Sequence, residues 1–324
     1  MCAYVEITSF LGEQAVKAGN DQLEIFLIPS WGSNLISMVE KKTGIELLRV
    51  PNDREEFWNT PVLYGTPILF PPNRIDGGMF TFNNEKYQFD INEPDKNNHI
   101  HGFVHTRKWE LRKAEIVDGK VIIETEFYSA IHDDVKRQFP HDFCINMSYT
   151  LDGNTLQKKA TIKNFDKKPF PWGFGFHTTF FFPEDSSLFS LTASKRWKLN
   201  ERFLPTGVLE EIEYVDKLQK GMSLKNLPLD DAFLSSVGET GKNEAVITHP
   251  VEGIEIVYKV DENFKHWVVY NKDGQHQFVC PEPYTWVTNA PNLELPTSLT
   301  GLQVLEPGEE KVVKTEIKIL VKEL

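Results

Sequence analysis

Apolar and polar residues alternate one for one along much of this 324-residue chain, and no other feature constrains its fold as strongly. A period of two places every second side chain on one face of a β-strand, so each such run predicts a strand with one buried face. Strands are predicted at residues 22–29, 120–129, 145–151, 253–260 and 310–320. No long amphipathic helical pattern separates these runs, which argues against a parallel α/β sheet. We therefore predict an all-β fold of stacked, mostly antiparallel sheets with few short helices.

Turn signals between the runs fit antiparallel pairing. Residues 79–89 (MFTFNNEKYQF) alternate into and out of Asn83-Asn84, and Asn tolerates the left-handed conformation that a two-residue hairpin turn needs. Asp-Gly pairs at 118–119, 152–153 and 273–274 predict further turns, and only residues 52–59 and 215–222 resemble helices. Because no repeat, linker or shift in composition divides the chain, we predict a single domain over residues 1–324.

Charge and cysteine content exclude several classes of protein. Lys and Arg number 35 against 47 Asp and Glu, a net charge of −12, whereas a nucleic-acid partner requires clustered cations. No apolar run approaches the ~20 residues of a membrane span, and charged residues interrupt the first thirty positions, so no signal peptide is expected. Cys2, Cys144 and Cys280 lack the spacing of a disulfide framework or a zinc site. We expect a cytoplasmic monomer or weak homodimer.

The first candidate functional segment surrounds Arg74. Pro71 and Pro72 hold the approach extended, and Gly77-Gly78 allow the chain to turn soon after Arg74. A guanidinium held in this way presents several donors in one plane, which suits a polyhydroxyl ligand or a carboxylate. A surface ion pair would explain the same arginine.

A second segment carries His99, His101 and His105. If His99 and His101 lie in one strand, they share a face, and this arrangement is also a candidate metal chelate. A cupin-like site would need a Glu four or five residues after the second histidine, but those positions are His105 and Thr106. The segment alone does not decide between a functional and a structural role.

Two further segments each place one ionisable group among aromatic or proline residues. His177 follows the run PWGFGF and precedes two threonines, and Glu282 lies between Pro281 and Pro283. Each residue alone is more often structural. Partial burial would raise the pKa of a carboxyl group towards the range of a general base and would lower the pKa of an imidazole. Asp230, in an Asp-Asp pair, is a weaker candidate.

Taken together, these segments show a family resemblance. Five motifs follow one another in the family's order and at similar spacing: Asn73-Arg74-Ile75, His101-Gly102, Gly175-x-His177, Asp230-x-x-Phe233 and Glu282-Pro283-x-Thr285. From about residue 20 to its C-terminus the chain resembles the aldose 1-epimerase (galactose mutarotase) family. The resemblance implies a large antiparallel β-supersandwich with an open sugar cleft and no cofactor or metal.

By the same resemblance, Glu282 is the expected general base and His177 the general acid. His101, Arg74 and Asp230 are expected to position a small-molecule sugar, with Asn73 beside them, and His101 is also a candidate for proton transfer. The chain departs from the family at Gly102-Phe103, where two glycines are common, and after His177, where a Pro-Tyr-Phe run is usual. These departures affect the expected substrate more than the expected chemistry.

The predicted reaction interconverts the α and β anomers of a hexose. It would suit neutral pH if the pKa of His177 stays near its ordinary value of about 6.5 and that of Glu282 rises above about 4.3. Trp172 and Phe176, near His177 in sequence, are candidates for stacking on the sugar.

Three alternatives remain open. A hexose-6-phosphate 1-epimerase could use a cationic group formed by Lys195, Arg196, Lys198 and Arg202. A non-catalytic sugar-binding module on the same scaffold is suggested by the altered residues after His177. A metal-dependent β-barrel enzyme would use His99, His101 and His105.

Overall fold

Two eight-stranded sheets and one five-stranded sheet make up most of the protein in the computed structural model, which describes residues 3–237 and 241–322. In spatial order the first eight-stranded sheet contains β11 (Glu110–Val117), β12 (Lys120–Tyr128), β13 (Phe143–Asp152), β14 (Thr155–Asn164), β27 (Glu310–Val321), β23 (Ile254–Val260), β22 (Glu244–His249) and β18 (Leu188–Leu191). All of its pairs are antiparallel.

The second eight-stranded sheet carries most of the residues discussed below. Its order is β20 (Pro205–Glu211), β19 (Ala193–Leu199), β21 (Asp230–Ser235), β24 (His266–Tyr270), β25 (Phe278–Tyr284), β16 (Gly175–Phe176) and β6 (Ile68–Leu69), and β17 (Phe180–Phe181) also pairs with β25. The five-stranded sheet contains β1 (Tyr4–Phe10), β2 (Glu13–Gly19), β3 (Leu23–Ile28), β4 (Asn34–Glu40) and β5 (Ile45–Glu46).

Short pairs and helices complete the described chain. The two-stranded pairs are β7 (Arg74–Asp76) with β10 (Asn98–Ile100), β8 (Met79–Phe82) with β9 (Glu85–Gln88), and β15 (Phe170–Trp172) with β26 (Gln303–Leu305). The helices are α1 (Arg54–Asn59), α2 (Asp133–Gln138), α3 (Val215–Lys220) and α5 (Thr297–Thr300). None of the helices in the described ranges is long and apolar enough to cross a membrane.

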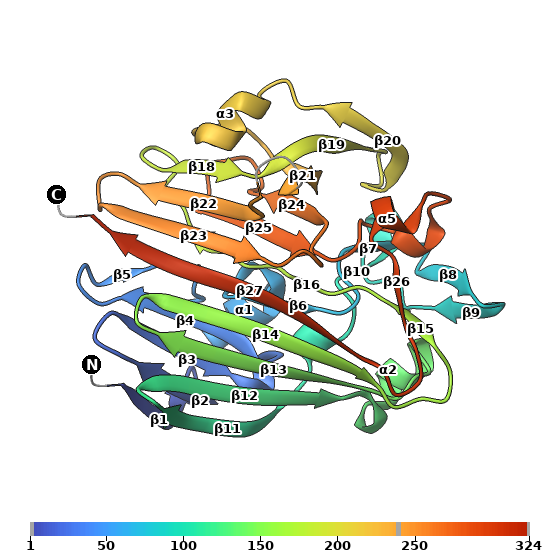
Figure 1. Ribbon diagram of the computed structural model, residues 1–324, viewed down its shortest axis with the longest axis horizontal. Coiled ribbons are helices and arrows are strands. Elements are labelled where there is room, and N and C mark those ends of the chain that lie inside the picture. The colour runs from blue at the N-terminus through green and yellow to red at the C-terminus, as the bar shows by residue number, and fades with distance from the viewer. Residues whose placement is uncertain (1–2, 238–240, 323–324) are drawn as a thin grey trace.

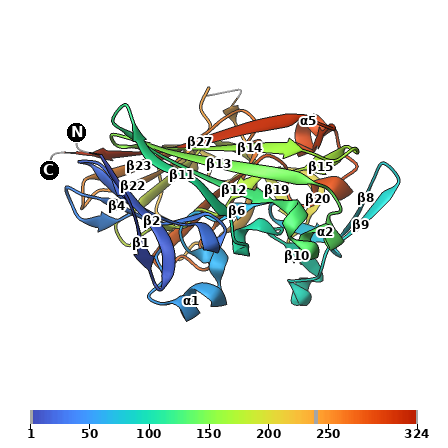
Figure 2. The same ribbon diagram turned by 90° about the horizontal axis from the view of Figure 1, so that it is seen from below.

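The sheets stack on one another around a shared core. In Figure 1 the first eight-stranded sheet crosses the molecule as a broad layer, with β27 at its centre between β14 and β23. Figure 2 shows the layer formed by β27, β14 and β13 along one side and α1 and β10 on the opposite side. One hydrophobic cluster extends from Val16 to Ile319 and joins side chains of all three large sheets.

The alternation read from the sequence corresponds to burial in the strands. In β12 and β27 buried residues recur at every second position, as expected for a sheet with one face against the core. The five predicted strands are confirmed as β3, β12, β13, β23 and β27, and the hairpin at residues 79–89 is confirmed as β8–β9 with Asn83 and Asn84 at φ values of 48° and 63°. The predicted all-β fold with few short helices is therefore confirmed.

The helices show where local patterning was too weak. The predicted segments 52–59 and 215–222 contain α1 and α3, and the Asp53 side chain caps α1 by accepting a hydrogen bond from the Glu56 amide at 2.8 Å. Helices α2 and α5, of six and four residues, were not predicted from the sequence.

Candidate active site

Strand β25, which carries Glu282, pairs with a continuous strand on one side. On its other side the pairing is interrupted. On one side, β24 pairs continuously with β25, placing Val268 opposite Glu282. On the other side, β16 pairs Gly175 with Tyr284 and β17 pairs Phe180 with Val279, and both pairs have the same register. Counting inward from either pair brings His177 opposite Glu282.

The prolines around Glu282 account for this local structure. Proline has no amide hydrogen, so Pro281 and Pro283 cannot donate to a neighbouring strand. The segment between β16 and β17 instead bonds to its other neighbour, because the His177 amide donates to the Pro67 carbonyl at 3.0 Å and the Thr179 amide to the Gly65 carbonyl at 2.9 Å. The gap in the ladder therefore holds His177 and Glu282 as facing side chains of adjacent segments.

The two side chains are in direct contact and nearly excluded from solvent. Nε2 of His177 lies 3.2 Å from Oε1 of Glu282, and the two residues are 3% and 2% exposed. The Tyr284 hydroxyl, two residues further along the same face of β25, donates to the other carboxylate oxygen of Glu282. The Asn73 amide in turn donates to the Tyr284 oxygen at 3.4 Å.

Burial shifts the pKa values of His177 and Glu282 in opposite directions. Burial raises the pKa of Glu282 well above its ordinary value, although the hydrogen bond from Tyr284 acts the other way. Burial lowers the pKa of His177 to about 3, so the expectation that it would stay near 6.5 is wrong. The raised pKa expected for Glu282 is confirmed. Both shifts favour an uncharged pair, a carboxyl group beside a neutral imidazole.

Arg74 is held between two carboxylates. Its Nε donates to both oxygens of Glu93 at 3.1 and 3.0 Å, and its Nη2 donates to Asp230 at 3.4 Å. Burial alone would lower the pKa of Arg74, but Asp230 and Glu93 outweigh it and raise the pKa. The ion pair expected as the alternative is present, but Arg74 itself is only 9% exposed, its two carboxylate partners are partly exposed, and it lines the cavity described below.

The histidine segment separates into different environments. His99 lies in β10, where its Nδ1 donates to the Asp90 carbonyl at 2.7 Å and its ring packs on Phe89. His101 follows with a φ of 65° and Gly102 repeats that conformation, so the chain leaves the strand and carries the His101 ring away from His99. The prediction that His99 and His101 share a strand face is therefore wrong.

Gly102 makes this turn sterically feasible. A Cβ atom at this position would meet the Phe70 carbonyl oxygen at 2.1 Å, so the close approach requires glycine. The His101 ring then lies with its centroid 5.2 Å from that of His177 and 6.5 Å from that of His105. Burial and the neighbouring His177 lower the pKa of His101 well below its ordinary value.

A cavity of about 440 Å³ brings the candidate residues together. All six residues that the family resemblance assigned to the site line this cavity: Asn73, Arg74, His101, His177, Asp230 and Glu282. The segment Pro61–Leu63 and Val268 supply apolar surface. A volume of this size lies in the range of small-molecule sites. The structure thus places the candidate acid, base and positioning residues around one space.

Sequence reasoning missed several members of the site. Tyr270 lines the cavity, Glu93 holds Arg74, and Tyr284 bonds to Glu282, whereas His105, considered in the sequence only as a metal ligand, also lines the cavity. Tyr284 could have been found from its spacing, because the second residue after Glu282 in a strand lies on the same face. The contact between Glu93 and Arg74 depends on tertiary structure and has no local signal.

The basic residues considered for phosphate binding form ion pairs with carboxylates. Lys195 pairs with Glu211, Lys198 with Glu210, and Arg202 with Asp76. Arg196 lies near Glu210, Glu213 and Asp231. None of the four lines the 440 Å³ cavity, so the predicted cationic group for a phosphate is not formed there.

Two other expectations concern residues outside the cavity. Trp172 and Phe176 are 1% exposed and belong to the core, so the suggestion that they stack on a sugar is wrong. Within the described ranges, no group of three or more His, Cys, Asp or Glu side chains is arranged to hold a metal ion. Cys144 and Cys280 are free and buried, and Cys2 lies outside the described residues.

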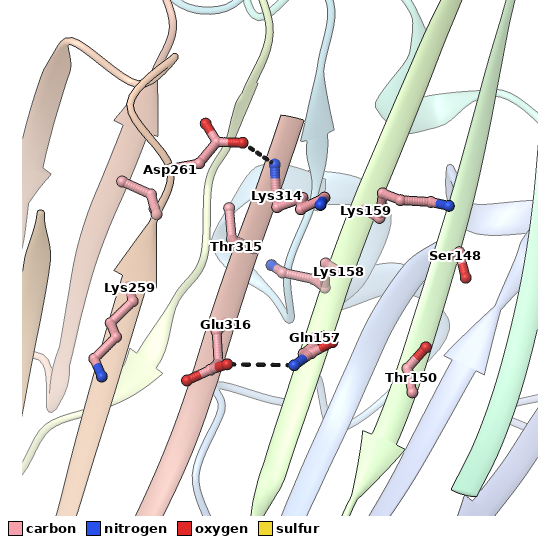
Figure 3. A pocket seen from close by; sticks show the side chains of 11 residues that line it. Ser148, Thr150, Gln157, Lys158, Lys159, Lys259, Asp261, Lys314, Thr315 and Glu316 are labelled. Carbon is pink, nitrogen blue, oxygen red and sulfur yellow. Dashed lines mark hydrogen bonds between the residues drawn. The ribbon is translucent and has the colours of Figure 1, made fainter. Parts of the chain in front are cut away.

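A second hollow on the outer face of the first eight-stranded sheet has a different character. Figure 3 shows its lining by side chains of β13, β14, β23 and β27, among them Lys159, Lys259 and Lys314. Its volume is about 570 Å³. Its lining includes no histidine, and its two carboxylates, Asp261 and Glu316, are partly exposed.

Comparison with known proteins identifies what this arrangement is similar to. A sequence model of the family described as aldose 1-epimerase matches residues 14–318. The uncharacterised protein YihR of Escherichia coli (strain K12) is 26% identical over 270 residues, which cover 81% of this chain and 80% of YihR.

Solved structures show the same fold. A galactose mutarotase-like protein from Clostridium acetobutylicum superposes with a TM-score of 0.94 at 28% identity, covering 98% of this chain and 99% of the other. A galactose 1-epimerase from Lactobacillus acidophilus NCFM has a TM-score of 0.78 at 15% identity and covers 99% of both chains.

Proposed function

The chain belongs to the aldose 1-epimerase family, and from that premise we propose that it is an aldose 1-epimerase acting on a hexose. The observation that supports this most directly is the contact of 3.2 Å between His177 and Glu282 in the cavity lining. Anomer exchange needs an acid and a base at two oxygens, O1 and the ring oxygen O5, that are bonded to the same carbon. An acid–base pair for this reaction must therefore be closely adjacent, as these two side chains are.

The proposed reaction conserves protons at each step. A carboxylate at Glu282 takes the proton of O1, and the imidazolium of His177 delivers a proton to O5. The C1–O5 bond breaks as the C1=O1 double bond forms, which gives the open-chain aldehyde. After rotation about C1–C2, His177 takes the proton back from O5 and Glu282 returns one to O1 as the ring closes on the other face.

The protonation state of the pair suits this sequence. The raised pKa of Glu282 and the lowered pKa of His177 keep one transferable proton on the pair, on the carboxyl group when the site is free. Transfer of that proton across the 3.2 Å contact produces the carboxylate and imidazolium that the first step uses. Each well-placed proton transfer contributes roughly 10²–10⁴-fold to the rate.

The remaining cavity residues are proposed to orient the sugar. Arg74 and Asp230 present charged donors and acceptors on one side of Glu282, and His101 presents an imidazole beside His177. Since Glu93 and Asp230 already fix the Arg74 side chain, little rotamer freedom is lost when it binds a hydroxyl group.

Polarimetry tests the proposal. Freshly dissolved α-D-glucose or α-D-galactose is mixed with the protein, and the approach to the equilibrium rotation is followed against a protein-free blank. Acceleration that scales with protein concentration supports an aldose 1-epimerase. Binding of the sugar without acceleration would support the non-catalytic module instead.

We also propose that the protein resides in the cytoplasm. Cys144 and Cys280 are free thiols, which fits the reducing cytoplasm predicted from the cysteine spacing. A monomer or weak homodimer stays a prediction, to be tested by light scattering at several protein concentrations.

A further inference from the structure

His105 is a polar cavity group to which the proposed reaction gives no role. It lies in a 3-10 turn, Val104–Thr106, and its ring lines the cavity beside His101. The backbone at His105 is tightly held, because a Cβ atom on Gly32 would lie 2.1 Å from the His105 carbonyl oxygen. The ring is therefore presented from a fixed position.

The imidazole of His105 has unused hydrogen-bonding capacity. Its Nδ1 is buried and has no hydrogen-bond partner in the part of the chain that the structure describes. Burial and the nearby Arg107 lower the pKa of His105 to about 4, so the ring is neutral at physiological pH. A neutral imidazole has one donor and one acceptor nitrogen, which matches a hydroxyl group better than a charged group.

The position of His105 indicates which part of a sugar it would meet. Ring contacts connect His177 to His101 and His101 to His105, and all three residues line the cavity. In the proposed reaction His177 serves the ring oxygen, whereas Glu282 serves O1. A sugar atom near His105 would then lie further from C1 than the ring oxygen does.

We propose that His105 binds a sugar hydroxyl group remote from C1 and thereby helps to determine which aldose the site accepts. The inference rests on the proposed function, because it uses the placement of C1 between His177 and Glu282. In this proposal His105 contributes to binding, and His177 and Glu282 carry out the proton transfers.

The test compares kinetic constants of wild type, His105→Ala and His105→Gln on several sugars. The panel is D-galactose, its C4 epimer D-glucose, 6-deoxy-D-galactose and D-xylose, which lacks the C6 group. His105→Ala should raise KM about three- to tenfold, as loss of one neutral hydrogen bond does, while kcat stays within about twofold. The increase should vanish for the analogue that lacks the hydroxyl group bound by His105, and Gln should restore part of the affinity.

Two results would overturn the assignment. Equal KM values for wild type and both variants on every sugar would show that His105 binds none of them, and a fall in kcat at unchanged KM would place it in the chemistry. Thermal melting of each variant establishes that the fold is intact. If wild type accelerates no sugar, the proposed function fails, and calorimetric binding of D-galactose to wild type and His105→Gln then tests the contact by itself.

Discussion

His177 and Glu282 face each other in adjacent antiparallel segments, with Nε2 and Oε1 3.2 Å apart, where prolines interrupt the ladder between them. The interruption and the contact have one origin. Pro281 and Pro283 lack the amide hydrogens that a continuous ladder would use, so the facing segment keeps its register without pairing. The chain thereby holds an imidazole and a carboxylate side by side, with Glu282 in β25 and His177 in the short segment between β16 and β17.

Replacing Glu282 by Gln should remove most of the catalysis. The amide keeps the size of the side chain but cannot take the O1 proton, so kcat is expected to fall about 10²–10⁴-fold. Polarimetry on α-D-galactose measures the change, and Glu316→Gln on the outer face shown in Figure 3 is the matched control. Full activity of Glu282→Gln would exclude this carboxylate from the mechanism.

The hydrogen bond from Tyr284 should set the alkaline limb of the pH profile. Tyr284 donates to Glu282 and so holds its pKa below the value that burial alone would give. Tyr284→Phe removes the donor, the pKa of Glu282 rises further, and the pair keeps its transferable proton up to a more alkaline pH. The alkaline limb of kcat/KM should therefore move to higher pH.

A buried tyrosine elsewhere provides the control for that shift. Tyr149 donates to the Ser33 carbonyl at 2.6 Å, far from the cavity lining, so Tyr149→Phe should leave the pH profile in place. An alkaline limb that moves to lower pH in Tyr284→Phe would contradict the role assigned to the hydroxyl group.

Much of this site was predictable, because its parts are marked locally. Glu282 between prolines and His177 among aromatic residues are unusual in sequence, and the motifs resemble a known family. What the sequence could not provide was burial. The expectation for the pKa of His177 failed because full desolvation of the ring depends on side chains from distant strands.

The histidine segment shows a second limit. The strand period assigned His99 and His101 to one face, but the strand ends at Ile100 and His101 adopts a left-handed conformation. That turn depends on the close approach of Gly102 to Phe70, a contact between segments that local patterning does not contain. The core strands were easier to predict, because burial of one face imposes the period of two on the sequence itself.

Substitution of Arg74 should weaken sugar binding even when the positive charge is kept. Lys cannot reach both Glu93 and Asp230 with one planar group, so Arg74→Lys should loosen the cation and raise KM about tenfold or more, with a smaller effect on kcat. Arg112→Lys at the exposed pair with Glu126 is the control, expected to behave as wild type. An unchanged KM would show that Arg74 does not contact the sugar.

Phosphorylated sugars should not be preferred. Because Lys195, Lys198 and Arg202 are already paired with carboxylates, a phosphate would have to displace those partners. The value of kcat/KM for D-glucose 6-phosphate is therefore expected not to exceed that for D-glucose. A preference for the phosphate, lost in Lys198→Met or Arg202→Met, would revive the alternative substrate.

Lys158 should destabilise the fold increasingly as the pH falls. It is 1% exposed, its Nζ lies 3.5 Å from the Tyr258 hydroxyl, and Tyr258 also accepts from Thr178, the neighbour of His177. Burial lowers the pKa of Lys158 well below its ordinary value, although the faces of the Phe176 and Tyr258 rings favour the cation.

The sign of this effect follows from linkage. Above the pKa of about 10.4 in the unfolded chain, the Lys158 amine is neutral in both the folded and the unfolded state. Below that pH the unfolded chain binds a proton at Lys158 and the folded protein does not, so stability is lost as the pH falls towards the folded pKa. Lys158→Met has no such penalty and should melt a few degrees above wild type at pH 7, with a smaller difference at pH 10. Calorimetric melting across that range measures it, with the exposed neighbour Lys159→Met as control. A difference that grows towards pH 10 would contradict a neutral, buried amine at this position.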